Sequence, residues 1–192
     1  MSWKYVLKGY IVNPTSENTL FYDDSCVIIK DSFPKAKYHL LILPRDHKIT
    51  IKDPKTLTFK EKSRYEKYIV WAKNYILETS KSNGGFDNNI KINDIRVGIH
   101  YVPSLANLHI HVITNDFVSD KLKYPKHYKA FNGPFFVDWD QLPLPPPYLT
   151  SKEAEMKYIK LQPLKCSHCD YPFKNLPTLK KHLKQEWETK KN

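Results

Sequence analysis

The chain has 192 residues and a formal net charge of +11 at pH 7, because 31 lysine and arginine residues outnumber 20 acidic ones. Hydrophobic residues make up 41% of it, which excludes a chain disordered throughout, and no apolar run approaches the roughly 20 residues of a membrane span. Three cysteines exclude the disulfide framework of an exported protein, and the polar N-terminus lacks a secretory signal, so we expect a reducing intracellular compartment.

Hydrophobic periodicity divides the first half of the chain into a short helix, three strands and one long helix. In chain order these patterns cover residues 2–10, 20–22, 26–30, 38–43 and 59–80. The run Ser82-Asn83-Gly84-Gly85 ends the long helix.

The second half begins with two further strands, predicted over residues 94–100 and 108–114. Residues 115–150 read as irregular and proline-rich, ending in the stiff connector LPLPPPYL. Strands, one long helix and then more strands predict an α+β fold with a mostly antiparallel sheet. We place this domain at residues 1–145 and a connector with a small C-terminal module at residues 146–192.

The C-terminal module carries the spacing of a zinc finger. Cys166 and Cys169 form a CxxC pair, and His182 follows on a predicted helix. One turn further, where a second histidine is usual, stands Glu186, whose carboxylate is a legitimate zinc ligand. The alternatives are His168 as fourth ligand, or a CxxC pair unrelated to metal. We expect a structural Zn²⁺ ion in a ββα-type finger that is too small to fold without it.

The basic charge of this module indicates a nucleic-acid partner. Residues 151–192 contain ten lysines and five acidic residues, with Lys180, Lys181 and Lys184 on the predicted finger helix. Cations bind phosphate, and the 14% of aromatic residues offers rings for base stacking. A purely structural finger on a lysine-rich protein is the alternative, since net charge reports association and not fold.

A pair of histidines marks the last predicted strand. Strand alternation puts His109 and His111 on one face and Leu108, Ile110 and Val112 on the other. Two imidazoles on a buried strand need a reason, because polar groups are costly to bury without partners. They could bind a metal, or one of them could attack a phosphorus atom and form a phosphoramidate.

These motifs resemble those of a known family. The segments IIKDSFPKAKYHLLILP and NLHIHVIT are similar to the histidine-triad superfamily of nucleotide hydrolases and transferases. The block VPSLANLHIHVITNDF, the segment KHYKAFN and the CxxC…His finger together resemble the aprataxin family within it. The resemblance covers most of residues 1–188. It implies a histidine-triad fold and removal of AMP from adenylated DNA 5′ ends left by abortive ligation.

The resemblance also implies catalytic roles for particular residues. His109 matches the nucleophile that forms an AMP-histidine intermediate, and His111 and Ser104 match groups that support the phosphate. His100 matches a histidine that protonates the departing DNA 5′-phosphate, with a structural histidine as the alternative. Asn107 stands where the triad has its first histidine, so the network behind His109 departs from the family pattern.

Substrate-binding roles follow in the same way. Asp31 matches an acidic residue that binds ribose hydroxyls, with a turn-forming aspartate as the alternative. His39 matches a histidine near the triad that supports the site, and Lys35 and Lys126 match lysines that contact DNA or phosphate.

Trp3 and Leu7 resemble an N-terminal helix that wedges against the base pair exposed at a nick. Simple docking of this helix onto the domain is the alternative reading for both residues.

We therefore expect a DNA 5′-adenylate hydrolase of single-strand break repair, with nicked or broken DNA carrying 5′-AMP as partner and AMP as product. RNA–DNA junctions are a further candidate substrate. We expect a monomer in the nucleus with no membrane partner and no catalytic metal. A general nucleotide phosphoramidase or dinucleoside polyphosphate hydrolase is the first alternative. A non-enzymatic sensor of DNA breaks is the second, and regulation of transcription through the finger is the third.

Overall fold

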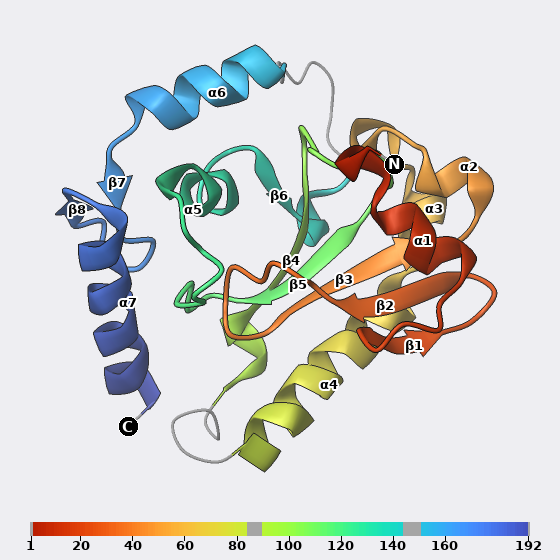
Figure 1. Cartoon of the computed structure of the whole chain (residues 1–192), viewed down its shortest axis with the longest axis horizontal. Helices are drawn as coiled ribbons and strands as arrows, with labels where there is room; N and C mark the ends of the chain where they lie inside the picture. The colour runs from red at the N-terminus through yellow and green to blue at the C-terminus, as the bar shows by residue number, and fades with distance from the viewer. Residues whose placement is uncertain (1, 84–89, 144–150, 192) are drawn as a thin grey trace.

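A six-stranded sheet forms the centre of the protein. The computed structural model describes residues 2–83, 90–143 and 151–191. The strand order is β1-β2-β3-β5-β4-β6, and every pairing is antiparallel, which confirms the expected sheet (Figure 1). The strands are β1 (Thr19–Tyr22), β2 (Cys26–Lys30), β3 (His39–Pro44), β4 (Ile95–His100), β5 (Ile110–Thr114) and β6 (Phe136–Asp138).

Helices surround this sheet, and a two-stranded ribbon lies next to the C-terminal helix. The α-helices are α1 (Leu7–Val12), α2 (His47–Thr50), α3 (Phe59–Ser63), α4 (Glu66–Asn83), α5 (Pro125–Phe131), α6 (Lys152–Leu161) and α7 (Leu176–Lys191). The ribbon pairs β7 (Leu164–Lys165) with β8 (Pro172–Phe173). None of the described helices combines the length and the apolar character needed to cross a bilayer.

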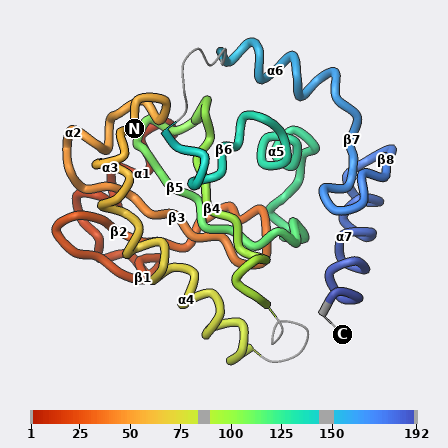
Figure 2. Tube along the Cα trace, turned by 180° about the vertical axis from the view of Figure 1, so that it is seen from behind, coloured from red at the N-terminus to blue at the C-terminus, as the bar shows by residue number. Residues whose placement is uncertain are grey.

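The two faces of the sheet are covered differently. Helix α4 covers one face, as the view from behind in Figure 2 shows, and its apolar stripe meets alternate residues of the strands. This α4 cluster includes Ile28, Ile42, Ile69, Ala72, Ile76, Ile110 and Val112. On the other face, helix α1 packs on β2 and β3, in an α1 cluster of Leu7, Ile11, Val27, Ile29, Leu41 and Leu43.

The finger module covers the opposite end of that second face. Its apolar side chains join those of β5, α5 and β6 in one finger cluster, made of Ala36, Ile113, Phe117, Leu122, Tyr128, Phe131, Phe136, Leu164, Cys166, Leu176, Leu179 and Leu183. Polar contacts add to this packing: the Ser167 amide donates to the Tyr128 hydroxyl at 2.9 Å, and Lys190 Nζ donates to Asp94 Oδ1 at 2.8 Å. The strip of sheet between the α1 cluster and the finger cluster carries the histidines described below.

Several sequence predictions of local structure need correction. The expected helix over residues 2–10 is a 3-10 turn at Trp3–Tyr5 followed by α1, and the expected helix over residues 59–80 is divided into α3 and α4. The chain turns between those two helices, and this turn buries Tyr65 at 2% exposure. The apolar period that predicted the helix runs from Tyr65 to Ile76 and belongs to the turn and to α4, whereas α3 buries none of its residues.

The prediction that residues 115–150 are irregular is wrong for α5 and β6. Helix α5 has seven residues, which is too short to show a helical period, although Pro125 stands at its first turn, where proline is favoured. Most of the proline-rich connector, with the expected domain boundary at residues 145 and 146, lies outside the described residues.

Candidate active site and zinc finger

Strand alternation holds at the histidine pair. Ile110 and Val112 point into the α4 cluster, while the rings of His109 and His111 lie together on the other face, with centroids 4.9 Å apart. Both histidines are buried, at 6% and 5% exposure. The pleat of β5 therefore separates a core face from a face with imidazole chemistry, as the sequence predicted.

The ring of His109 is held in one tautomer. Its Nδ1 lies 2.7 Å from the backbone carbonyl oxygen of Asn107, which can only accept, so Nδ1 carries the proton. Burial holds the pKa of His109 below its ordinary value of 6.5, although the carbonyl acts in the opposite direction. The ring is therefore neutral near pH 7, with a lone pair on Nε2.

His39 holds the ring of His111 in the same way. His39 Nδ1 accepts from the Lys35 amide at 3.2 Å, so its proton is on Nε2, which donates to His111 Nδ1 at 2.9 Å. His111 then carries its own proton on Nε2, an atom that is buried and has no partner among the described residues. Burial lowers the pKa of His39 to about 4 and that of His111 well below 6.5, so both rings stay neutral. His111 thus presents an unused N–H donor to the site.

His100 joins this group from the neighbouring strand. Its ring lies 5.0 Å from that of His111 and contacts Phe131 and Phe136 edge to face, at centroid distances of 4.5 and 5.3 Å. Burial, with the nearby histidines, lowers its pKa to about 3. The structure therefore brings His100 next to the triad strand, which strand parity alone did not assign.

A glycine makes room for this aromatic wall. Gly98 pairs with His111 on one side and with Asp138 on the other. A Cβ at this position would lie 2.4 Å from the Val137 carbonyl oxygen and 2.6 Å from the Phe136 ring. Only glycine allows β6 to approach β4 closely enough for Phe136 to pack beside the histidines.

The loop before β3 brings an acidic residue, Asp31, and a lysine, Lys35, next to His39 at the edge of the histidine site. Asp31 Oδ1 accepts from the Phe33 amide at 2.8 Å, so the turn-forming role is present, and Oδ2 lies 3.3 Å from His39 Nδ1. Lys35 and Lys126 come from distant segments, and both lower the pKa of the half-buried His127, after burial as the main cause. The two lysines expected to meet phosphate therefore both lie near His127.

The N-terminal segment lies over the loop that carries Ser104. The Lys4 carbonyl accepts from the Ala106 amide at 2.9 Å, and Ser104 itself is exposed. Trp3 is 67% exposed beside this loop, whereas Leu7 is only 4% exposed and packs in the α1 cluster. The burial of Leu7 favours the alternative of docking for this residue, because the sheet already covers its side chain, whereas the exposed Trp3 leaves the predicted contact with DNA open.

The finger brings together its four predicted ligands. The ligand atoms of Cys166, Cys169, His182 and Glu186 all lie within 4.8 Å of one another. His182 Nε2 lies 3.2 Å from Cys169 Sγ and 3.2 Å from Glu186 Oε1. Two thiols, an imidazole and a carboxylate are the donor set of tetrahedral zinc. His168 points away from this group, since its Nε2 lies 3.0 Å from the Asn115 carbonyl oxygen.

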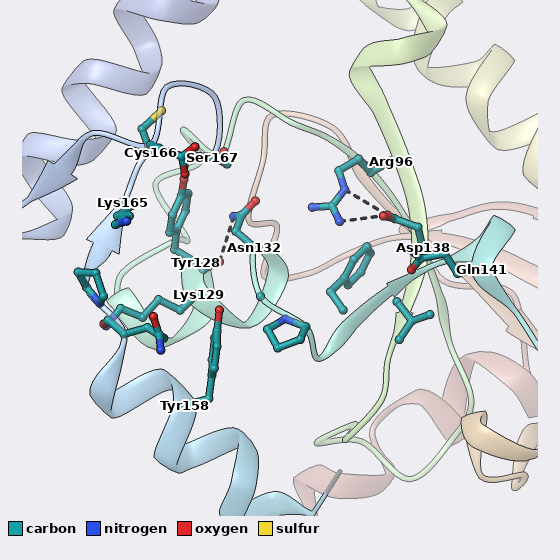
Figure 3. A pocket seen from close by; sticks show the side chains of 17 residues that line it. Arg96, Tyr128, Lys129, Asn132, Asp138, Gln141, Tyr158, Lys165, Cys166 and Ser167 are labelled. Atoms are coloured by element: carbon teal, nitrogen blue, oxygen red, sulfur yellow. Dashed lines mark hydrogen bonds and ion pairs between the residues drawn. The ribbon is translucent and has the colours of Figure 1, made fainter. Parts of the chain in front are cut away.

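A cavity of about 680 Å³ separates the finger from the sheet (Figure 3). Arg96 on its wall donates to Asp138 Oδ1 at 3.0 Å, and Lys129 donates to the carbonyl oxygens of Ile159 and Gln162 at the end of α6. Both of these cations already bind protein groups. The histidines described above do not line this cavity, which lies where the sheet, α6 and the finger meet.

Known proteins match this arrangement over the whole chain. Residues 4–127 match the family described as scavenger mRNA decapping enzyme C-terminal binding, and residues 132–189 match the C2HE / C2H2 / C2HC zinc-binding finger. An aprataxin-like protein of Saccharomyces cerevisiae is 42% identical, over 98% of this chain and 98% of its own. The chain belongs to the aprataxin family.

Solved aprataxin structures agree with this membership. The aprataxin ortholog Hnt3 in complex with DNA superimposes with a TM-score of 0.84 at 32% identity, over 98% of this chain and 96% of that chain. Hnt3 in complex with DNA and guanosine gives a TM-score of 0.81 at 33% identity, over 98% and 97%. As an aprataxin with the histidine-triad fold, the chain is a DNA-repair hydrolase that acts on adenylated DNA, and it carries a zinc-binding finger.

The sequence patterns did not identify three residues that shape the site. Gly98 and Phe136 shape the wall described above, and Thr50 bonds the side chain of Asn107 from helix α2. A glycine inside a predicted strand is a known sign of close backbone approach, so Gly98 could have been found. Nothing in the local sequence marks Thr50 or Phe136, because only the folded chain brings them to the histidines.

Proposed function

We propose that His109 carries the reaction as a nucleophile and that AMP is released in two steps. In the first, His109 Nε2 attacks the phosphorus of the 5′-AMP group, and the bond from that phosphorus to the DNA 5′-phosphate oxygen breaks. In the second, water attacks the same phosphorus, the bond to Nε2 breaks, and AMP leaves with the new oxygen. The fixed tautomer of His109 is the observation that carries this proposal, because a proton on Nδ1 leaves the lone pair on Nε2.

The unused donor of His111 supports its role beside the phosphate. A buried N–H without a partner is costly, and a phosphate oxygen would accept from it. Negative charge develops on that oxygen in the transition state and strengthens its hydrogen bond with His111. An interaction that is stronger in the transition state than in the ground state accelerates the reaction. We assign Ser104 to the same phosphate and Asp31 to the ribose hydroxyls of AMP.

We assign protonation of the departing DNA 5′-phosphate to His100. Its low pKa makes it neutral in the free protein. Bound phosphates are negatively charged and raise the pKa of a nearby imidazole, so this role depends on bound substrate. Lys35, Lys126 and the exposed Trp3 would hold the DNA around the site.

We propose that the step at phosphorus uses no metal and that zinc is held by Cys166, Cys169, His182 and Glu186. Asp31, His39 and His111 also offer ligand atoms within 4.8 Å of one another. The two steps at His109 need no Lewis acid, however, and His39 Nε2 already donates its proton to His111 Nδ1 at 2.9 Å. When bound, the zinc ion would supply the folding energy of the finger.

Replacing His109 with alanine tests the nucleophile. We expect the variant to release no AMP from adenylated nicked DNA, and we expect acid quenching of the unaltered protein to trap AMP bound to His109. The exposed His47 on α2 gives a matched control, since His47→Ala should keep full activity. Equal AMP release by His109→Ala and the control would refute the proposal.

The finger lysines test the substrate class. Lys181→Glu on the exposed side of α7 should slow turnover of adenylated DNA, more strongly at low salt, and should leave a small adenylate ester unaffected. Equal effects on both substrates would favour a general nucleotide phosphoramidase. Tight nick binding without trapped AMP-histidine would favour a DNA-break sensor.

We propose further that the protein acts as a monomer in the nucleus and accepts RNA–DNA junctions. A nuclear location follows from a DNA substrate, and the attacked phosphorus belongs to the AMP group in both kinds of junction. Analytical ultracentrifugation, imaging of the tagged protein and turnover of an adenylated RNA–DNA junction test these three points separately.

A further inference from the structure

The side chain of Asn107 is held by a residue from a distant helix. Asn107 and Thr50 are both buried, at 7% and 6% exposure, and Asn107 Nδ2 donates to Thr50 Oγ1 at 3.1 Å. The other amide atom, Asn107 Oδ1, is buried and has no partner among the described residues. Thr50 therefore makes the one side-chain contact that orients this amide within the described structure.

A second hydrogen bond from the same threonine acts on the backbone. The Leu108 amide donates to the Thr50 carbonyl oxygen at 2.7 Å. This N–H belongs to the same peptide unit as the Asn107 carbonyl, which accepts from His109 Nδ1 at 2.7 Å. One planar unit is thus bound to Thr50 on its donor side and to the nucleophile on its acceptor side.

This arrangement strengthens the bond that fixes His109. A peptide whose N–H is already donating becomes a better acceptor at its carbonyl, because hydrogen bonds in a chain polarise one another. The side-chain contact prevents rotation of Asn107, and the backbone contact prevents tilting of the peptide. Any rotation of that peptide would move the carbonyl away from Nδ1 and release the proton to either ring nitrogen.

We propose that Thr50 is a positioning residue for the aprataxin reaction, acting through Asn107 and the 107–108 peptide to hold His109 as the Nδ1–H tautomer. The inference rests on the proposed role of His109 as nucleophile. It also accounts for Asn107 in place of a histidine, since the amide N–H supplies a donor to Thr50 without introducing a titratable group.

The test removes the hydroxyl without changing the shape of the side chain. Thr50→Val keeps the volume and the backbone carbonyl but leaves Asn107 Nδ2 without an acceptor. Thr50→Ser restores the hydroxyl. Thr19→Val is the matched control, because the Thr19 hydroxyl is also buried but has no partner among the described residues and lies on β1. Asn107→Leu removes the other half of the contact and serves if Thr50→Val does not fold.

Two readouts are needed, and one of them does not require activity. Nitrogen-15 NMR of the full-length, zinc-loaded chain without substrate reports which ring nitrogen of His109 carries the proton. Steady-state kinetics on adenylated nicked DNA give kcat and KM separately. We expect Thr50→Val to populate the Nε2–H tautomer and to lower kcat by about 10- to 100-fold with little change in KM, while Thr50→Ser and Thr19→Val match the unaltered chain.

An unchanged tautomer in both Thr50→Val and Asn107→Leu would overturn the inference, whatever the rates. Equal losses of kcat in Thr50→Val and Thr50→Ser would also overturn it, because the hydroxyl would then be irrelevant. If the unaltered protein released no AMP, the proposed function would fail, while the tautomer measurement would still decide the role of Thr50.

Discussion

A single methyl group at Gly98 should damage both the fold and the site. The Cβ of Gly98→Ala would lie 2.4 Å from the Val137 carbonyl oxygen and 2.6 Å from the Phe136 ring. The first of these neighbours is backbone on the paired strand β6, so no side-chain rotation relieves the contact. Strands β4 and β6 would have to separate by about 1 Å to reach ordinary van der Waals distance.

The expected cost follows from this geometry. Overpacking of this kind costs about 1–3 kcal/mol, and we expect the upper end because a backbone atom must move. For a protein of this size, about 3 kcal/mol corresponds to a fall in Tm of about 6–12 °C. Phe136 contacts the rings of His100 and His111, so its displacement should also lower kcat, by about 100-fold for a misplacement of 1 Å.

Thermal unfolding and turnover of adenylated nicked DNA measure these two effects. Gly9→Ala is the control, because nothing lies within 4 Å of a Cβ there and alanine in a helix stabilises by roughly 0.5–1 kcal/mol relative to glycine. The reasoning is refuted if Gly98→Ala melts with the unaltered chain and keeps its kcat.

Three further predictions concern titration, metal and the N-terminal segment. The folded pKa of His39, about 4, lies below the ordinary 6.5, so the unfolded chain binds more protons between these values, and this group alone should cost about 3 kcal/mol of stability as the pH drops from 6.5 towards 4. Urea unfolding of His39→Asn should therefore show a shallower pH dependence than the unaltered chain, and the slope that remains comes from His100, His109 and His111, whose pKa values are lowered as well; an unchanged slope would contradict this. Removing zinc with a chelator should lower Tm and slow turnover of a small adenylate ester as well as of DNA, because the finger cluster includes Phe131 and Phe136; an ester rate that survives chelation would contradict this. Leu7→Ala should cost about 2–5 kcal/mol of stability, because Leu7 is buried. Trp3→Ala should leave Tm unchanged, because Trp3 is exposed, and should weaken nick binding by about 1–3 kcal/mol through lost base stacking. Calorimetry measures the first effect and DNA titrations measure the second.

The sequence predicted the cluster of Cys166, Cys169, His182 and Glu186 because its geometry is local. Cys166 and Cys169 lie on one tight turn, and His182 and Glu186 lie one helical turn apart on α7. Spacing along a turn or a helix fixes which side chains share a face, whatever the rest of the chain does. The same reasoning predicted that His109 and His111 would lie together on one face of their strand.

The support behind these histidines could not be predicted by periodicity. His39 meets His111 because β3 pairs with β5 in one register, and a shift of one residue would turn His39 to the opposite face. Leu7 shows the same limit of periodicity. Its apolar spacing predicted a helix face, but only the sheet beneath α1 decided that this face is buried.

Local residue order determined most of the strands and the long helix, the shared face of His109 and His111, and the common face of His182 and Glu186, since each depends on backbone periods of two or 3.6 residues. Tertiary structure decided the tautomer of each ring, the burial that lowers their pKa values, the room at Gly98 and the contact between Thr50 and Asn107. These features depend on pairs of atoms from segments far apart in the chain, and such atoms meet only when hydrophobic burial on both faces of the sheet fixes the register and closes the fold.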